Sequence, residues 1–269
     1  MTSFIMNNNN IHFKHDGSTS LTIFDEPSEY SHISEKGSKR LQPIEMMEFQ
    51  SKIASLASIE LRNLNIPTPL LKSKYEVEIS VASCRNIDEL PLLLLMKSIV
   101  DGLNKRILSD DADVYKCSIN YHPKKQHSRH SRTEPLDWLT LKVIDLNSSR
   151  TIIAIHDLNI HLVHKKNPYI LEPEDDVLPF WYGDIYLSKL WDALNKQSFT
   201  IPSSSSYQVT MKFVGAVGSK DVDNLALFFY PLIELNEYFS LTGIRSITLE
   251  KEYDSYKSHT EIQIIPLLC

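Results

Sequence analysis

The sequence predicts an α+β fold in which one chain carries two similar units, each a small mixed β-sheet with flanking helices. A six-residue phrase occurs twice, as Arg-Asn-Ile-Asp-Glu-Leu at residues 85–90 and as Lys-Asp-Val-Asp-Asn-Leu at residues 220–225. Each copy follows a segment in which apolar and polar residues alternate, and each leads into a strongly apolar segment. A phrase that recurs with the same surroundings indicates a duplicated unit.

The predicted elements come in the same order in both halves. Alternating patterns predict central strands at residues 75–81 and 207–214, and apolar residues at helix spacing predict the helices that follow them. These helices span residues 90–108 and 225–241. A further helix is predicted before each central strand, at 45–64 and 185–196, and two strands after each apolar helix, at 114–121 with 139–146 and at 244–253 with 261–265. The segment from Thr151 also has a strand pattern.

Length and composition set the domain organisation. We expect residues 1–18, which include four consecutive Asn, to be a disordered tail, residues 19–148 to form the first unit and residues 149–269 the second. Three cysteines with no Cys-x-x-Cys spacing favour a reducing cytoplasm over a disulfide scaffold. The longest apolar run, Leu90–Met96, contains Pro91 and is far shorter than the roughly 20 residues that span a bilayer, so we expect a core helix and no membrane partner.

The charge pattern bears on nucleic acid as a partner. The formal net charge of −6 gives no general basic excess. The segment of residues 122–132 is the local exception, because it combines three histidines with Lys124, Lys125, Arg129 and Arg132. It is either a solvated loop between two strands or a DNA-binding loop that contacts phosphates.

The phrase, the helix after it and the acidic turn that follows carry a resemblance to a known family. Residues 85–90, then Asp-Gly-Leu-Asn at 101–104, then Asp110-Asp111 before a strand resemble the RusA family of Holliday junction resolvases. Residues 19–56 resemble the first strand and connecting loop of that family. The resemblance covers most of residues 19–146 and, in weaker form, residues 150–266.

This resemblance implies an activity and a site. RusA-like enzymes are homodimers whose paired acidic sites bind Mg²⁺ and nick two strands of branched DNA in recombination and repair. The catalytic residues implied in the first unit are Asn86, Asp88, Asp110 and Asp111, with Asp88 and Asp111 as ligands for Mg²⁺ or Mn²⁺, a hard cation suited to carboxylate oxygens. A duplicated chain would then be an intramolecular pseudo-dimer.

Both units depart from the family pattern. Asn86 stands where the first Asp is expected, and in the second unit Leu241 and Gly243 stand where acids should follow the helix. We therefore expect Asp221 and Asp223 to be the relic of a second site, with at most one working site, in the first unit. The family also carries a Lys one helical turn after the second Asp, where this chain has Leu92 and Leu227.

Simpler interpretations compete with an active site. Asp88 and Asp223 fall at predicted helix N-termini, where an Asp can cap backbone N–H groups. If the carboxylates instead converge, their repulsion should raise the pKa of at least one of them unless a cation is bound. His161 and His164 point to opposite faces of a strand, so a zinc site is not expected.

Two functions remain open. One is a Mg²⁺-dependent, structure-selective endonuclease that acts on branched DNA. The other is a catalytically inactive protein of the same fold that binds branched DNA or a protein partner such as a true resolvase. The sequence has no Gly-rich phosphate loop and no Gly-x-Ser-x-Gly phrase that would favour another class of enzyme.

Overall fold

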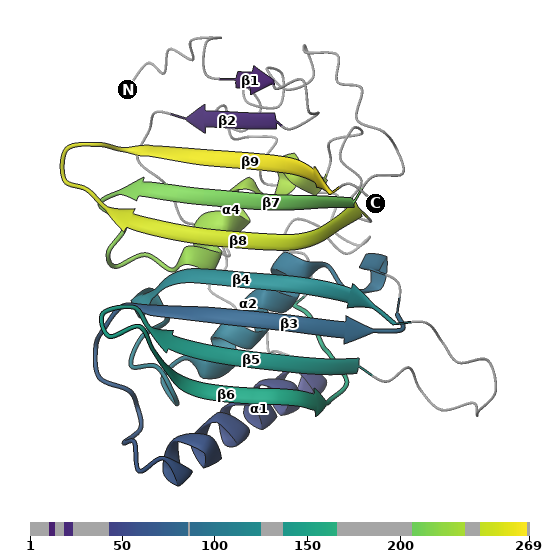
Figure 1. Cartoon of the computed structure of the whole chain (residues 1–269), viewed down its shortest axis with the longest axis vertical. Helices are drawn as coiled ribbons and strands as arrows, with labels where there is room; N and C mark the ends of the chain where they lie inside the picture. The colour runs from purple at the N-terminus through teal and green to yellow at the C-terminus, as the bar shows by residue number, and fades with distance from the viewer. Residues whose placement is uncertain are drawn as a thin grey trace, which may run out of the picture.

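The computed structural model describes residues 11–13, 19–23, 43–85, 87–124, 137–165, 206–234 and 243–267. These residues form an α+β fold with one mixed sheet, in the strand order β1-β2-β9-β7-β8-β4-β3-β5-β6 (Figure 1). The strands are β1 Ile11–Phe13, β2 Thr19–Ile23, β3 Tyr75–Ser83, β4 Val114–Pro123, β5 Asp137–Asp145, β6 Arg150–Asn159, β7 Ser206–Gly215, β8 Ile244–Tyr253 and β9 His259–Leu267.

The centre of the sheet is the antiparallel pair β4 and β8. On both sides of this pair, the next two strands outward pair in the same directions. β3 runs parallel to β4, and β7 runs parallel to β8. The next strand outward, β5 or β9, is antiparallel to its neighbour. Both parallel pairs shift register at the same point, directly after Tyr75 in β3 and directly after Tyr207 in β7.

The outer strands connect the two sequence halves. β2, from the first predicted unit, pairs with β9 of the second. β6, which begins the second predicted unit, pairs with β5 of the first. The boundary predicted between residues 148 and 149 therefore falls inside the hairpin that joins β5 to β6, because strands separated by a short turn pair most readily with each other.

The core lies between the sheet and its helices. The helices are α1 Ile44–Asn63, α2 Leu92–Leu103 and α4 Val222–Glu234. α2 and α4 lie behind the sheet in Figure 1 and contact both β4 and β8, while α1 packs on α2 and β6. Alternate strand residues such as Val77, Ile79 and Leu141 are buried against this layer, as the period-2 pattern predicts.

Most predicted elements are confirmed, with three differences. The helix predicted to reach residue 108 ends at Leu103, because Asn104 is extended and Lys105 has a left-handed φ of 61°. After this turn, Leu108 forms an isolated β-bridge with Leu70. Within residues 1–18, which we expected to be a disordered tail, Ile11–Phe13 forms β1, which pairs antiparallel with β2. The second predicted apolar helix is observed as Val222–Glu234, and its remainder lies outside the described residues.

Two predicted features fall on other parts of the chain. The helix predicted at 185–196 and most of the tail lie outside the described residues. Among the helices that the structure describes, none combines the length and the apolar character needed to cross a membrane.

The contact between α1 and α2 allows a first prediction. A Cβ added to Gly102 would lie 3.2 Å from the backbone Cα of Gln50, whereas one added to Gly218 would meet only side-chain atoms at 3.7 Å. We expect Gly102→Val to force the helices apart and to lower the free energy of unfolding by about 1–3 kcal/mol. Urea denaturation of both variants measures this, and a Gly102→Val protein no less stable than Gly218→Val would contradict the close packing.

Candidate functional site

Two turns from opposite halves of the chain meet at one end of the sheet. One is the 3-10 turn Asp111–Asp113, which leads into β4, and the other precedes α4 and carries Asp221. They meet because of how three strands pair. β7 runs parallel to β8, and β4 runs antiparallel to β8, so the start of β4 lies at the same end of the sheet as the ends of β7 and β8. Lys251, in β8, is buried and its Nζ donates to the carbonyl oxygens of Ala112 and Lys220, one in each turn.

Three carboxylates converge there. One oxygen from each of Asp110, Asp111 and Asp221 lies within 4.8 Å of the other two. Asp110 is exposed and caps its own turn by accepting from the Ala112 N–H at 3.2 Å, while Asp111 is buried. Asp221 Oδ2 accepts from Asn224 Nδ2 at 2.8 Å. Carboxylate oxygens are the ligands that Mg²⁺ or Mn²⁺ prefers.

The grouping differs from the one that the sequence suggested. We expected Asp110 and Asp111 to act with Asp88 of their own half and Asp221 to be a relic. The structure instead brings Asp221 to Asp110 and Asp111. Asn86 and the side chain of Asp88 lie outside the described residues, so the predicted pair Asp88–Asp111 is not described.

Asp223 does not cap α4, so the capping interpretation is wrong for this residue. Its side chain is fully buried, and Oδ2 accepts from Lys97 Nζ of α2 at 2.6 Å. Within the part of the chain that the structure describes, Oδ1 has no hydrogen-bond partner. A buried carboxylate oxygen without a partner is costly in free energy, which marks a position where a cation would be stabilising.

Lys97 and Asp101 are site residues that the sequence analysis missed. Lys97 Nζ lies 3.4 Å from Asp101 Oδ1 as well as contacting Asp223, and Lys165 forms an ion pair with the other oxygen of Asp101. Burial alone would lower the pKa of Lys97, but the charges of Asp223 and Asp101 outweigh it and raise that pKa well above its usual range. A single Lys inside the apolar run of residues 92–100 was the available signal, because Lys is rarely buried unless it is paired.

The electrostatics of the two adjacent aspartates differ. The Ala112 N–H and the Lys105 ammonium hold the pKa of Asp110 below its usual range. Burial, together with the charges of Asp221, Asp223 and Asp101, raises the pKa of Asp111 to about 7. This is the raised pKa expected from converging carboxylates.

That raised pKa predicts how stability depends on pH without a divalent cation. In the folded state, Asp111 keeps its proton up to about pH 7. In the unfolded chain, Asp111 loses the proton near pH 3.8, its ordinary pKa. Its contribution to stability is therefore lost as the pH rises between these values. We expect Asp111→Asn to raise the melting temperature, in EDTA, more at pH 8 than at pH 4.5. A pH-independent difference would contradict the burial of this carboxyl group.

Of the four predicted DNA-binding residues, the structure describes Lys124, which lies away from the acidic turn. Lys124 directly follows β4, so the ten residues of that strand, roughly 30 Å, separate it from the acidic turn at the start of β4. Its Nζ lies 3.2 Å from the ring centroid of Trp138. Lys125, Arg129 and Arg132 lie outside the described residues.

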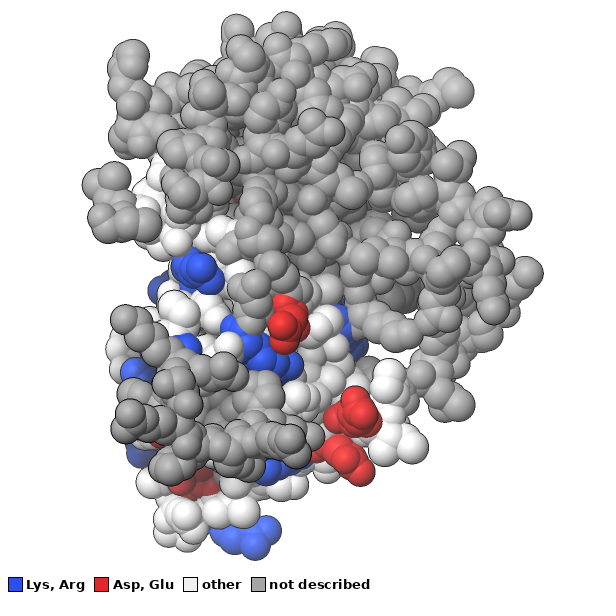
Figure 2. Space-filling view, turned by 90° about the vertical axis from the view of Figure 1, so that its right-hand side faces the viewer, with Lys and Arg blue, Asp and Glu red and all other residues white. Residues whose placement is uncertain are grey.

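Figure 2 shows the end of the sheet where β3 and β4 finish. Lys and Arg side chains gather near the middle of this face, with acidic side chains beside them.

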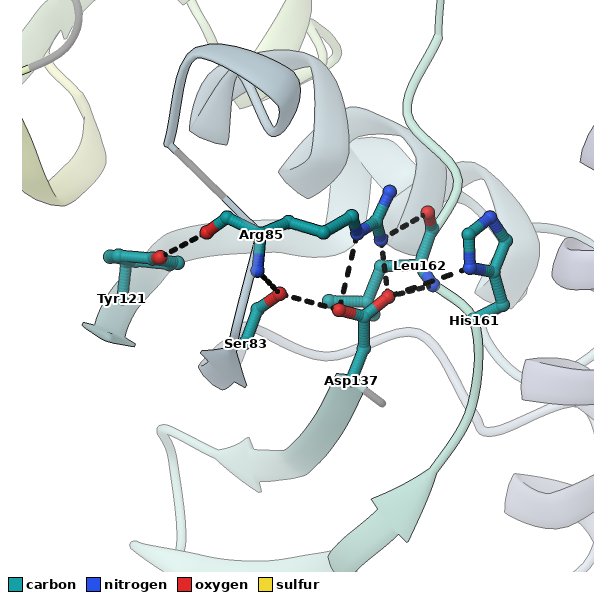
Figure 3. Close-up of polar contacts among 6 residues, drawn as sticks. All are labelled: Ser83, Arg85, Tyr121, Asp137, His161 and Leu162. Atoms are coloured by element: carbon teal, nitrogen blue, oxygen red, sulfur yellow. Dashed lines mark hydrogen bonds and ion pairs between the residues drawn. The ribbon is translucent and has the colours of Figure 1, made fainter. Parts of the chain in front are cut away.

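The basic residue that opens the first phrase has a structural partner. Arg85 contacts the fully buried carboxylate of Asp137 through Nε, at 3.2 Å, and through Nη2, which also donates to the Leu162 carbonyl oxygen at 2.8 Å (Figure 3). Asp137 also accepts from Ser83 Oγ at 2.5 Å and from the Leu162 N–H at 3.0 Å. These contacts fasten the segment after β6 to the end of β3.

Comparisons with known proteins give no identification. No protein-family model, no curated protein and no solved structure matches this chain.

Proposed function

We propose that this protein is a RusA-like endonuclease that uses Mg²⁺ or Mn²⁺ to hydrolyse a phosphodiester bond in branched DNA, at one site formed by both halves of the chain. The observation that carries the proposal is the convergence of Asp110 and Asp111 from one half with Asp221 from the other. The first half has Asn86 in place of an acid, and the second has Leu241 and Gly243 in place of the later acids. Asp110 and Asp111 of the first half and Asp221 of the second together form one acidic cluster at the same end of the sheet.

The strand pairing supports the duplication on which this proposal rests. β4 begins at Val114 and β8 at Ile244, an offset of 244 − 114 = 130 residues. Ser118 pairs with Thr248, and 248 − 118 is also 130. Each of these two residues is thus paired with its own counterpart, as expected at a two-fold axis. The exchanged strands β2 and β6 fit an intramolecular pseudo-dimer made of two intertwined units.

The chemistry of the acidic turns fits a hard divalent cation. Asp110, Asp111 and Asp221 would hold it. Two residues after Asp221, Oδ1 of Asp223 is a further buried oxygen, with no hydrogen-bond partner among the described residues. When bound, the cation supplies Lewis-acid polarisation of the phosphoryl oxygen and hydroxide at neutral pH. Lys251 fixes the spacing of the two turns through its contacts with Ala112 and Lys220.

A second candidate is the inactive protein that binds branched DNA or a protein partner. The net charge of −6 favours it, because DNA affinity depends largely on cationic contacts to phosphates. Lys97 also compensates Asp223 and Asp101 without a metal. In this case the basic residues near Lys124 would bind phosphates, and the acidic turns would have only a structural role.

One experiment separates the candidates. A synthetic four-way junction, labelled on each strand in turn, is incubated with the protein in Mg²⁺, Mn²⁺ or EDTA, and a linear duplex of the same sequence serves as the control. We expect nicks in the junction that require the metal. Binding without nicking, with an affinity that falls steeply as salt rises, would favour the inactive DNA-binding protein. Neither binding nor nicking would reject both DNA functions.

A further inference from the structure

Lys97 has an unusual position for a lysine. It lies inside α2 among apolar residues, and its side chain is only 7% exposed. Its Nζ lies between two carboxylates, 2.6 Å from Asp223 Oδ2 and 3.4 Å from Asp101 Oδ1. Asp223 lies in the first turn of α4, two residues after Asp221. The ammonium therefore contacts a carboxylate next to one of the two turns that carry the converging aspartates.

We infer that the protein binds one divalent cation and that the Lys97 ammonium fills the position where a second one would otherwise bind. This inference rests on the function proposed above and specifies the composition of its site. Enzymes that use two metal ions for phosphoryl transfer hold them about 3.5–4 Å apart. Here the carboxylates next to Asp111 that could hold a second ion are Asp223 and Asp101, and both have an oxygen in contact with Nζ.

The Lys97 ammonium opposes a second ion at Asp223. An ion on Oδ2 would lie about 2.0–2.1 Å from that oxygen, next to a cationic nitrogen that is 2.6 Å from the same oxygen, and the two positive charges would repel each other. Oδ1 of Asp223 has no hydrogen-bond partner among the residues that the structure describes, and the single ion would be held by Asp110, Asp111 and Asp221. Lys97 is thus a positioning residue that acts through Asp223 and neutralises charge without binding the substrate.

The test is the number of Mn²⁺ ions bound per chain, measured by equilibrium dialysis, together with electron paramagnetic resonance, which detects coupling between neighbouring Mn²⁺ ions. We expect one ion and no coupling in the wild type. In Lys97→Met, Asp223 and Asp101 lose their shared cation, and we expect a second ion with Mn–Mn coupling. Lys97→Met combined with Asp223→Asn removes one of these charges and should return to one ion. Lys116→Met is the matched control, because it breaks a 2.6 Å ion pair with Glu76 away from this site, and it should bind one ion.

The outcomes separate the inference from the proposed function. Two coupled ions in the wild type would overturn the inference and leave the metal-dependent activity standing, whether or not Lys97→Met folds. One ion in folded Lys97→Met would show that Lys97 does not occupy a cation position. No bound Mn²⁺ in the wild type would overturn the proposed function and the inference with it.

Discussion

Asp221→Asn is expected to reduce metal-dependent nicking of a four-way junction by about a thousand-fold. Asp221 supplies one of the three converging oxygens, and its half of the chain has Leu241 and Gly243 at the positions where the family carries its later acids. Metal ions contribute several kcal/mol to charge stabilisation in such reactions, and each 1.4 kcal/mol or so is a factor of ten in rate. The initial rate of strand nicking at saturating Mn²⁺ measures the loss. Asp111→Asn should behave in the same way.

Asp88→Asn is the matched comparison, because Asp88 is the counterpart of Asp223 in the other phrase. A site formed by both halves at Asp110, Asp111 and Asp221 predicts that Asp88→Asn keeps most of the activity. The grouping suggested by sequence, in which Asp88 binds the metal with Asp111, predicts the opposite order. Loss of nicking in Asp88→Asn with retention in Asp221→Asn would therefore reject the site proposed above.

Asp137→Ala is expected to cost about 3–5 kcal/mol of unfolding free energy, the loss typical when one partner of a buried ion pair is removed. The Asp137 side chain is fully buried, and that of Arg85 is 11% exposed. The substitution also leaves the Ser83 hydroxyl and the Leu162 N–H without their acceptor. Urea denaturation measures the change, provided that the slope of free energy against urea is unaltered.

Glu78→Ala is the control for this pair. Glu78 and Lys142 form an ion pair at 3.5 Å in which both side chains are 40% exposed. Exposed pairs contribute about 0–1 kcal/mol, so this variant should be nearly as stable as the wild type. Replacing Arg85 by Met together with Asp137 by Leu should recover part of the lost stability. Equal effects of Asp137→Ala and Glu78→Ala would contradict the structural role of the Arg85–Asp137 pair.

Local patterns were enough to predict most of the secondary structure. The alternation that begins at Tyr75 and at Tyr207 predicted β3 and β7, because one face of each strand packs against helices while the other is polar. The end of α2 was not predictable in the same way. Its apolar pattern continues to Leu108, and only the left-handed conformation of Lys105 ends the helix earlier.

The site depends on pairings between distant strands, which local patterns do not specify. The repeated phrase identified Asp221 and Asp223, and the acidic turn identified Asp110 and Asp111, but their grouping depends on β4 lying antiparallel to β8. Assigning each acid to its own half followed from the order of the acids in the family that the sequence resembles, and that order does not specify which strands pair. Lys97 was missed because the Lys of the family pattern was sought one helical turn after each Asp, whereas the lysine that contacts Asp223 belongs to the opposite half.

The pairing of β4 with β8 has a consequence for how the chain can change over time. In an assembly of two identical copies, every substitution appears at both ends of the sheet, so an acid lost from one site is lost from the other. Here the two halves are encoded separately, and the end that holds Asp110, Asp111 and Asp221 can be retained while the opposite end changes freely. Since one chain contributes all three carboxylates, diluting the protein does not separate them.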